Sequence, residues 1–142
     1  MKDVLTNIFM ILIFLFVGCS SYSDDGGGYP SYREDVDIAG WQTITAEEAY
    51  LIMAEADNFI ILDVRTAAEF QMSRIDGAIL LPYDELILRA EDELPDTNAI
   101  ILIYCRSGNR SRTAASTLVS LGYTAVYDFG GIINWPFDTI SG

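Results

Sequence analysis

Residues 99–123, AIILIYCRSGNRSRTAASTLVSLGY, decide the fold class of this chain. Their first six residues form a short apolar run rich in β-branched side chains, which predicts a buried strand. Residues 110–123 predict a helix, because Ala114, Leu118 and Leu121 share one face and Gly122 suits the position that follows the last helical turn. A buried strand that leads through a short loop into an amphipathic helix is the repeating unit of α/β folds.

The same alternation of strands and helices extends towards both ends of the chain. Thr45 with Glu48, and Thr66 with Glu69, form Thr-x-x-Glu capping boxes that predict a helix over residues 46–56 and a brief helix after Thr66. Other segments predict strands at 59–64, 78–82 and 125–129 and an acidic helix at 83–93. We therefore expect an α/β fold of three layers, with a central, mostly parallel sheet and helices on both faces.

Length and composition exclude several classes of function. The chain has 142 residues, which suits one folded domain, and a formal net charge of −13, which disfavours binding to nucleic acid. It contains no histidine, so Ser-His and Cys-His nucleophile pairs and histidine-ligated zinc are excluded. We expect no metal site and no cofactor.

The amino-terminal segment has the features of an export signal. Residues 8–17 form an apolar run that is short for a membrane span, and the following FVGCSS resembles the lipobox of bacterial lipoproteins. By that resemblance residues 1–18 are a signal peptide and Cys19 carries the lipid, although an ordinary signal peptide or an uncleaved anchor remains an alternative. Residues 19–40 predict a flexible acidic tether and residues 41–142 a domain. The expected location is the bacterial cell envelope, outside the cytoplasm and anchored to a membrane.

The position of CRSGNRS makes Cys105 a candidate nucleophile. The segment lies between the carboxyl end of a predicted central strand and the amino end of a helix, where open α/β sheets place their ligand sites. Converging backbone amides and the helix dipole favour a thiolate there, and Arg106 and Arg110 add positive charge. Gly108 permits a sharp backbone path, and small polar groups at the rim come from Ser107, Asn109 and Ser111. The alternative is that Cys105 is a small apolar core residue.

The spacing of the arginines separates two kinds of cysteine chemistry. Cysteine phosphatases place five residues between the cysteine and an arginine that binds phosphate bidentately. Ser111 occupies that position here, whereas Arg110 arrives one residue early and Arg112 one residue late. A loop from Cys105 to Arg110 is small, which favours a ligand the size of one sulfur atom over a phosphate.

Four segments together resemble the rhodanese domain, a single-domain sulfurtransferase fold. LDVRTAAEF at 62–70 is similar to its Asp-Val-Arg segment, and SRIDGAILLP at 73–82 is similar to its Gly-His-Ile-x-Gly-Ala segment. YCRSGNRS at 104–111 resembles its six-residue active-site loop, and LGYTAVYDFGGIINW at 121–135 resembles its last strand and Gly-Gly-x-x-x-Trp segment. Ser73 and Arg74 stand where the family has Gly-His, which bears on local packing and substrate preference.

The resemblance implies a sulfurtransferase that moves a sulfane sulfur from thiosulfate or a persulfide to a thiol or cyanide. Cys105 would carry the sulfur as a persulfide, and the amides of Arg106 to Ser111 would hold it. Asp63 and Arg65 resemble the family's structural charge pair near the loop, the alternative being a solvated pair at a strand end. The expected partners are a small sulfur-containing anion or persulfide donor, a thiol acceptor and a membrane. A second hypothesis is a tethered, non-catalytic module that binds or senses sulfur species or a partner protein.

Overall fold

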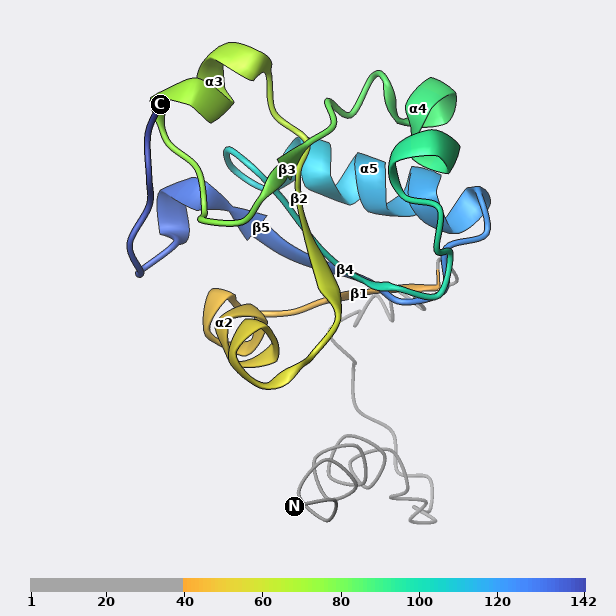
Figure 1. Ribbon diagram of the computed structural model, residues 1–142, viewed down its shortest axis with the longest axis horizontal. Helices are drawn as coiled ribbons and strands as arrows, with labels where there is room; N and C mark the ends of the chain where they lie inside the picture. Colours follow the sequence, from red (N-terminus) through yellow and green to blue (C-terminus); the bar gives the residue numbers. More distant parts are fainter. Residues whose placement is uncertain (1–39) are drawn as a thin grey trace, which may run out of the picture. The chain divides into compact units, whose positions relative to one another are not determined.

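A five-stranded sheet forms the centre of the part of the chain that the computed structural model describes, residues 40–142 (Figure 1). Its strands, in chain order, are β1 (Trp41–Thr43), β2 (Phe59–Asp63), β3 (Ile79–Leu80), β4 (Ile100–Cys105) and β5 (Val126–Gly131). They lie in the order β1-β5-β4-β2-β3, and each neighbouring pair is parallel. The carboxyl ends of the strands therefore share one edge of the sheet, where this topology positions ligands.

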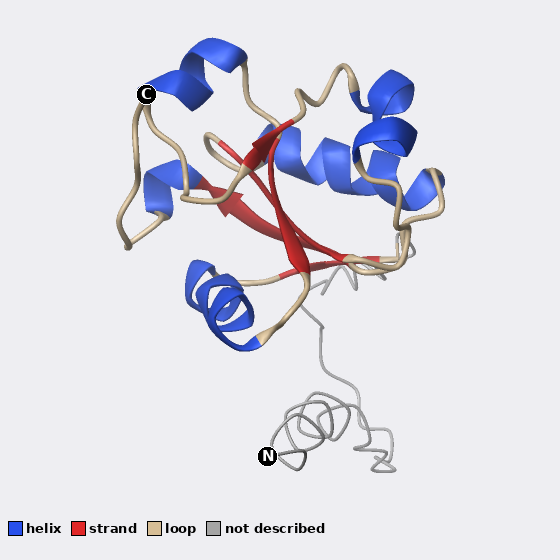
Figure 2. Cartoon of the chain, viewed as in Figure 1, coloured by secondary structure: helices blue, strands red, loops and turns tan. Residues whose placement is uncertain are grey.

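Helices cover both faces of this sheet. They are α2 (Ala46–Glu55), α3 (Ala67–Met72), α4 (Leu86–Glu93), α5 (Asn109–Ser120) and the short 3₁₀ helix η1 (Ile132–Asn134). Figure 2 shows α2 on one side of the strands and α4 and α5 on the other. The expected three-layer α/β architecture is confirmed. None of the helices within residues 40–142 combines the length and the apolar content needed to span a membrane.

Strand β4 is apolar at every position because both of its faces are buried. Ile101, Ile103 and Cys105 pack into the core cluster that α4 and α5 cover. Leu102 and Tyr104 point the other way, into the cluster on the side of α2. All five are at most 1% exposed. A strand covered on both faces buries every side chain, and this is the pattern that allowed the sheet to be predicted.

Both predicted capping boxes are present, and the second one orients a residue that matters below. In α2 the Thr45 hydroxyl accepts a hydrogen bond from the Glu48 amide at 3.1 Å, and the Glu48 carboxylate accepts one from the Thr45 amide at 2.7 Å. In α3 the Thr66 hydroxyl accepts from the Glu69 amide at 3.3 Å, and Glu69 Oε2 accepts from the Thr66 amide at 3.0 Å. The carboxylate of Glu69 is thereby fixed at the first turn of α3.

The boundaries of several elements differ from the prediction. Strand β1 was not predicted, because three residues at a sheet edge are too few to show a periodic pattern. Helix α4 begins at Leu86 because residues 83–85 form a turn, and its cap residue Glu85 makes no side-chain capping bond. Strand β3 is shorter than predicted, whereas β5 extends beyond residue 129 to Gly131. This extension of β5 places Gly131 against the loop that follows Cys105.

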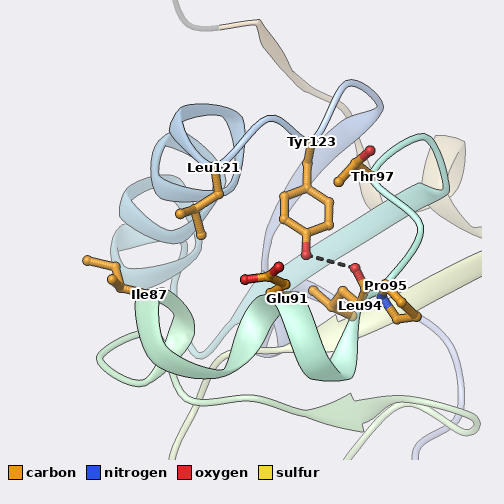
Figure 3. A pocket seen from close by; sticks show the side chains of 7 residues that line it. All are labelled: Ile87, Glu91, Leu94, Pro95, Thr97, Leu121 and Tyr123. Atoms are coloured by element: carbon orange, nitrogen blue, oxygen red, sulfur yellow. Dashed lines mark hydrogen bonds between the residues drawn. The ribbon is translucent and has the colours of Figure 1, made fainter.

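Leu121 was predicted to face the core, and this was wrong. Helix α5 ends at Ser120, so Leu121 is its cap residue and is 41% exposed. It lines a groove together with Ile87 of α4 and Tyr123 (Figure 3). The Tyr123 hydroxyl donates a hydrogen bond to the carbonyl of Leu94, the cap residue of α4, at 2.7 Å. Gly122 has a φ of +96°, as a glycine that terminates a helix commonly does.

Candidate active site

Cys105 lies at the carboxyl end of the central strand β4, and α5 begins four residues later at Asn109. Its side chain is buried, with 1% exposure. The backbone amide of Gly108 donates a hydrogen bond to Cys105 Sγ at 3.1 Å. The register of β4 against β5 shifts between Ile103 and Cys105, so that Cys105 pairs with Gly131. The cysteine thus sits at a local irregularity of the sheet, directly below the amino end of a helix.

Hydrogen-bond donors around the sulfur outweigh the effect of burial on its ionisation. Burial raises the pKa of the Cys105 thiol, but the amide and hydroxyl of Ser111 and the amides of Gly108 and Ser107 lower it. The net result is a pKa below the ordinary value. The amino end of α5 adds positive potential at the same place. Cys105 is therefore disposed to ionise without a histidine or any other general base.

Two glycines allow the loop to take this path. Gly108 has a φ of +99°, a conformation that costs other residues energy because of their Cβ atom. Gly131 has an extended backbone, but a Cβ on it would lie 2.4 Å from the carbonyl oxygen of Arg106 and 2.6 Å from Ser107 Cα. The backbone of the cysteine loop therefore packs directly against Gly131, which leaves no room for a side chain there. The sequence showed a Gly-Gly pair at 130–131, but nothing in it indicated this contact.

The three small polar residues predicted at the rim do not all lie there. Ser107 and Asn109 are exposed, as is Arg106. Ser111 is fully buried, and its hydroxyl donates to the carbonyl oxygens of Gly108 at 3.1 Å and Gly130 at 3.3 Å. The prediction for Ser111 was wrong because the first turn of α5 directs this side chain towards the end of β5. From its buried position, Ser111 therefore links the cysteine loop to the end of β5.

Arg110 is engaged by a carboxylate that the sequence analysis did not include in the site. Its Nη1 donates to Glu69 Oε2 at 2.8 Å and its Nη2 donates to Glu69 Oε1 at 2.7 Å, although the two residues lie 41 positions apart. Hydrogen bonds from Arg110 lower the pKa of Glu69 to about 2. The expected contribution of Arg110 to the positive charge around Cys105 is therefore largely compensated. The capping box gave Glu69 a local role in the sequence, but no signal linked it to the loop.

Asp63, the last residue of β2, and Arg65, two residues beyond it, form a buried ion pair next to the cysteine strand. Asp63 is 0% and Arg65 3% exposed, so the alternative of a solvated pair was wrong. Arg65 Nη2 donates to Asp63 Oδ2 at 2.6 Å and to the carbonyl oxygen of Ser73, also at 2.6 Å. Its guanidinium carbon lies 5.5 Å from the ring centroid of Tyr104. Because Ser73 is the residue after α3, the pair fixes the carboxyl end of the helix that carries Glu69.

Asp128 on β5 is a second buried carboxylate near the loop that sequence reasoning missed. It is 2% exposed, and its Oδ1 accepts a hydrogen bond from the Gly130 amide at 2.9 Å. Burial raises the pKa of Asp128, while hydrogen bonds involving Ser111 and Gly130 lower it, and the net shift is upward. A single acid within the apolar-rich segment AVYDF gave no indication that it would face the cysteine loop.

The part of the chain that the structure describes offers one nucleophile and no metal cluster. Within residues 40–142, no three His, Cys, Asp or Glu side chains lie together so as to hold a metal ion. Cys105 is the free cysteine of this region, whereas Cys19, the predicted lipidation site, lies outside it together with the predicted signal peptide and tether. A thiol with a lowered pKa, surrounded by amide donors, can attack an electrophilic atom and hold a small anionic group.

Comparison with known proteins gives a consistent result over most of the described region. Residues 45–136 match the family described as Rhodanese-like domain. The chain is 32% identical over 81 residues to the thiosulfate sulfurtransferase PspE of Escherichia coli (strain K12), covering 57% of this chain and 78% of that protein. It is 36% identical over 93 residues to a sulfurtransferase of Allochromatium vinosum, covering 65% of this chain and 85% of that protein. A solved structure described as a rhodanese with anions from E. coli aligns with a TM-score of 0.55 and 31% identity, over 58% of this chain and 98% of that one.

Proposed function

The chain belongs to the rhodanese-like domain family, and we propose that it is a sulfurtransferase in which Cys105 carries the transferred sulfur. Its relatives include proteins named as sulfurtransferases, so the general reaction class follows from the family. The observation that carries the assignment to Cys105 is the hydrogen bond from the Gly108 amide to its sulfur, 3.1 Å long, at the amino end of α5. The geometry supports the following two-step reaction.

In the first step the thiolate of Cys105 attacks the outer, sulfane sulfur of the donor. An electron pair of the thiolate forms a new S–S bond to the sulfane sulfur. The bond between that sulfur and the rest of the donor molecule breaks, and its electron pair leaves with the rest of the donor. With thiosulfate the leaving group is sulfite, and the enzyme holds a cysteine persulfide anion. The lowered pKa of Cys105 increases the fraction of thiolate that is available for this attack.

The loop then stabilises the negative charge on the terminal sulfur of the persulfide. The amide of Gly108 donates to Sγ, the amides of Ser107 and Ser111 also lower the pKa of Cys105, and all three belong to the segment that leads into α5. Fixed dipoles of this kind act without reorganising during the reaction, as they do in an oxyanion hole. The solved relative from E. coli is described as a rhodanese with anions, which supports an anionic occupant of the loop.

In the second step an acceptor nucleophile, a thiolate or cyanide, attacks the terminal sulfur of the persulfide. The new bond forms between the acceptor and that sulfur, the S–S bond to Cys105 breaks, and its electron pair returns to Sγ as a thiolate. The products are an acceptor persulfide or thiocyanate, and the enzyme regains its starting state. Exposed Arg106 and Ser107 line the side from which an acceptor would approach.

Mass spectrometry of the purified protein after exposure to thiosulfate tests this proposal. We expect the intact protein to gain the mass of one sulfur atom at Cys105, and cyanide to remove that sulfur as thiocyanate. A Cys105→Ser variant should show neither, while Ser116→Ala, which changes an exposed side chain of α5 outside the loop, should retain both. An active Cys105→Ser variant, or a wild-type protein that gains no sulfur from thiosulfate or from a persulfide, contradicts the proposal.

The same assay separates the other hypotheses. A non-catalytic module would bind sulfur species or a partner without turnover of thiosulfate and cyanide. A phosphatase would hydrolyse phosphate esters, yet the residue at the position of its phosphate-binding arginine is Ser111, which is fully buried and bonded to two carbonyl oxygens. We expect no release of phosphate at high enzyme concentration.

We further propose that the protein is exported and anchored to a membrane through a lipid on Cys19. This proposal stands on the sequence FVGCSS and the apolar run before it, which lie outside the described residues. Labelling of the full chain with palmitate in a bacterial host tests it. We expect labelling to be lost in Cys19→Ala and kept in Cys105→Ala; labelling that persists in Cys19→Ala refutes attachment at this residue.

A further inference from the structure

The contact between Glu69 and Arg110 places a negative charge beside a loop that is proposed to bind anions. Both side chains are about a quarter exposed, 26% for Glu69 and 27% for Arg110, so the pair lies at the surface of the site rather than in the core. Arg110 is the second residue of α5, and interaction with Cys105 is one of the causes that raise its pKa. Arg110 therefore pairs with a carboxylate of α3 while lying in the first turn of α5, the helix that directly follows the cysteine loop.

Glu69 is held rigidly and cannot swing away from Arg110 without losing other bonds. Its Oε2 accepts hydrogen bonds from the amide and the hydroxyl of Thr66, each at 3.0 Å, in addition to the bond from Arg110. Arg65 fixes the other end of the same helix through the carbonyl oxygen of Ser73. A carboxylate with four donors in fixed positions remains ionised at neutral pH and compensates the charge of Arg110 permanently.

The other charged residues near the loop do not make up for the positive charge of Arg110 that Glu69 neutralises. Within residues 40–142, Arg106 and Arg112 form no ion pair, but both side chains are exposed and so act through solvent. Asp128, on β5, is a further buried acid near the loop. Glu69 thus compensates the partly buried cation at the start of α5, in a chain whose net charge is already −13.

We propose that Glu69 determines the charge selectivity of the sulfur donor: by neutralising Arg110 it lowers the preference of the site for dianionic donors relative to donors with one negative charge. This inference rests on the proposed function and assigns a specificity role to a residue that touches Arg110 rather than the reacting atoms. The donor class it favours is a persulfide or thiosulfonate with a single charge at the reacting end.

Two donors that differ by one charge test the proposal directly. Thiosulfate carries two negative charges and releases sulfite, whereas methanethiosulfonate carries one and releases methanesulfinate; both transfer the same sulfane sulfur. Glu69→Gln leaves Arg110 uncompensated. We expect the ratio of kcat/KM for thiosulfate to kcat/KM for methanethiosulfonate to rise about three- to tenfold, the factor that one charge several ångströms away gives at a dielectric between those of a protein surface and water.

The chain offers a matched control for this substitution. Glu48 occupies the same third position of the other Thr-x-x-Glu capping box, on α2, and Glu48→Gln changes the net charge and the cap in the same way. Glutamine serves a capping box as glutamate does, so both helices keep their first turn. We expect the donor ratio of Glu48→Gln to equal that of the wild type.

Removing the positive charge of Arg110 instead of the negative charge of Glu69 should change the donor ratio in the opposite direction. Arg110→Gln leaves Glu69 as an uncompensated anion, so the donor ratio should fall below the wild-type value, and the double variant Glu69→Gln/Arg110→Gln should return it towards that value. A merely structural role for Glu69 predicts instead that both donors lose activity together, with an unchanged ratio. An unchanged ratio in Glu69→Gln refutes the charge-selectivity role.

Alkylation of Cys105 keeps the test independent of sulfur transfer. Iodoacetate is an anion and iodoacetamide is neutral, and the ratio of their rates with one thiol at fixed pH reports the local potential. Glu69→Gln should raise the iodoacetate-to-iodoacetamide ratio about three- to tenfold. A protein that shows this rise but transfers no sulfur refutes the proposed function and leaves the electrostatic role of Glu69 standing; a protein that transfers sulfur without the rise refutes the role and leaves the function.

Discussion

Replacing Gly131 by alanine should displace the cysteine loop while leaving every polar group of the site in place. The added Cβ would lie 2.4 Å from the carbonyl oxygen of Arg106, and ordinary van der Waals contact begins at 3.4 Å. The loop backbone must therefore move by about 1 Å to relieve the overlap. The neighbours are backbone atoms, which cannot rotate away as the end of a side chain can.

The cost follows from this displacement. Overpacking of a closely packed site typically costs about 1–3 kcal/mol of folding stability. A misplacement of about 1 Å at a reacting group lowers rates by about 10²-fold. Gly108 N would no longer approach Cys105 Sγ at 3.1 Å. We therefore expect Gly131→Ala to lose about 10²-fold in kcat/KM for transfer from thiosulfate to cyanide, and its Cys105 pKa to move upward towards the ordinary thiol value.

Gly122→Ala is the matched control. Gly122 has a φ of +96° and no atom within 4 Å of an added Cβ, so alanine there is strained but meets no neighbour. The left-handed conformation costs an alanine about 1–2 kcal/mol. Gly122→Ala should therefore lose stability in urea to a similar extent as Gly131→Ala and keep wild-type kinetics, because it lies at the far end of α5 from the loop.

Two measurements check the reasoning: initial rates of thiocyanate formation, and the pH dependence of Cys105 alkylation by iodoacetamide. If Gly131→Ala retains kcat/KM within about twofold of the wild type, then the loop does not rest on Gly131 and the argument is wrong. If both glycine variants lose activity in proportion to their loss of stability, the effect comes from unfolding and not from the position of the loop.

Three further predictions concern the groups that support the loop. Ser111→Ala removes the hydroxyl that donates to the carbonyl oxygens of Gly108 and Gly130, and should cost about 1–3 kcal/mol in urea unfolding. Because this hydroxyl also helps to lower the pKa of Cys105, that pKa should rise in iodoacetamide titrations; unchanged values contradict the prediction. Asp63→Asn leaves Arg65 buried without its ion partner and should cost about 3–5 kcal/mol; a loss below about 1 kcal/mol in urea unfolding would mean that the pair contributes little. Because the pKa of Glu69 is lowered from 4.5 to about 2, its ionised form stabilises the fold above pH 4.5, and this contribution is lost as the pH falls towards 2. Urea unfolding from pH 6 to pH 2 should show the stability gap between wild type and Glu69→Gln closing over that range, and a constant gap refutes the assignment.

The features that could be predicted from the sequence are those encoded by neighbouring residues. The buried strand β4, the helix α5 and both capping boxes depend on patterns a few residues long, and all were present. The position of Cys105 between strand and helix followed from the same local pattern. The order of the strands in the sheet was not predicted, because periodicity alone does not specify it.

The features that could not be predicted depend on contacts between distant parts of the chain. Glu69 and Arg110 meet because α3 and the start of α5 lie at the same edge of the sheet, and neither residue type nor spacing indicates which partner each would find. Ser111 looked like a rim residue because serine is usually exposed, yet the register shift that pairs Cys105 with Gly131 brings the end of β5 against it. Long-range register decides such contacts, and it has no local signature.

These contacts change the explanation of how the thiol is activated. From the sequence, the backbone amides and the helix dipole were expected to favour a thiolate, with Arg106 and Arg110 adding positive charge of the same sense. In the structure the side chain of Arg106 is exposed, Arg110 is compensated by Glu69, and the groups that lower the Cys105 pKa most are neutral donors from Ser111, Gly108 and Ser107. Neutral dipoles stabilise a negative charge within the loop, whether it lies on Sγ of the thiolate or on the terminal sulfur of a persulfide. We infer that ionisation of the cysteine and selection of the donor are separate properties of the loop: the amides set the first, and the arginines with their acidic partner set the second.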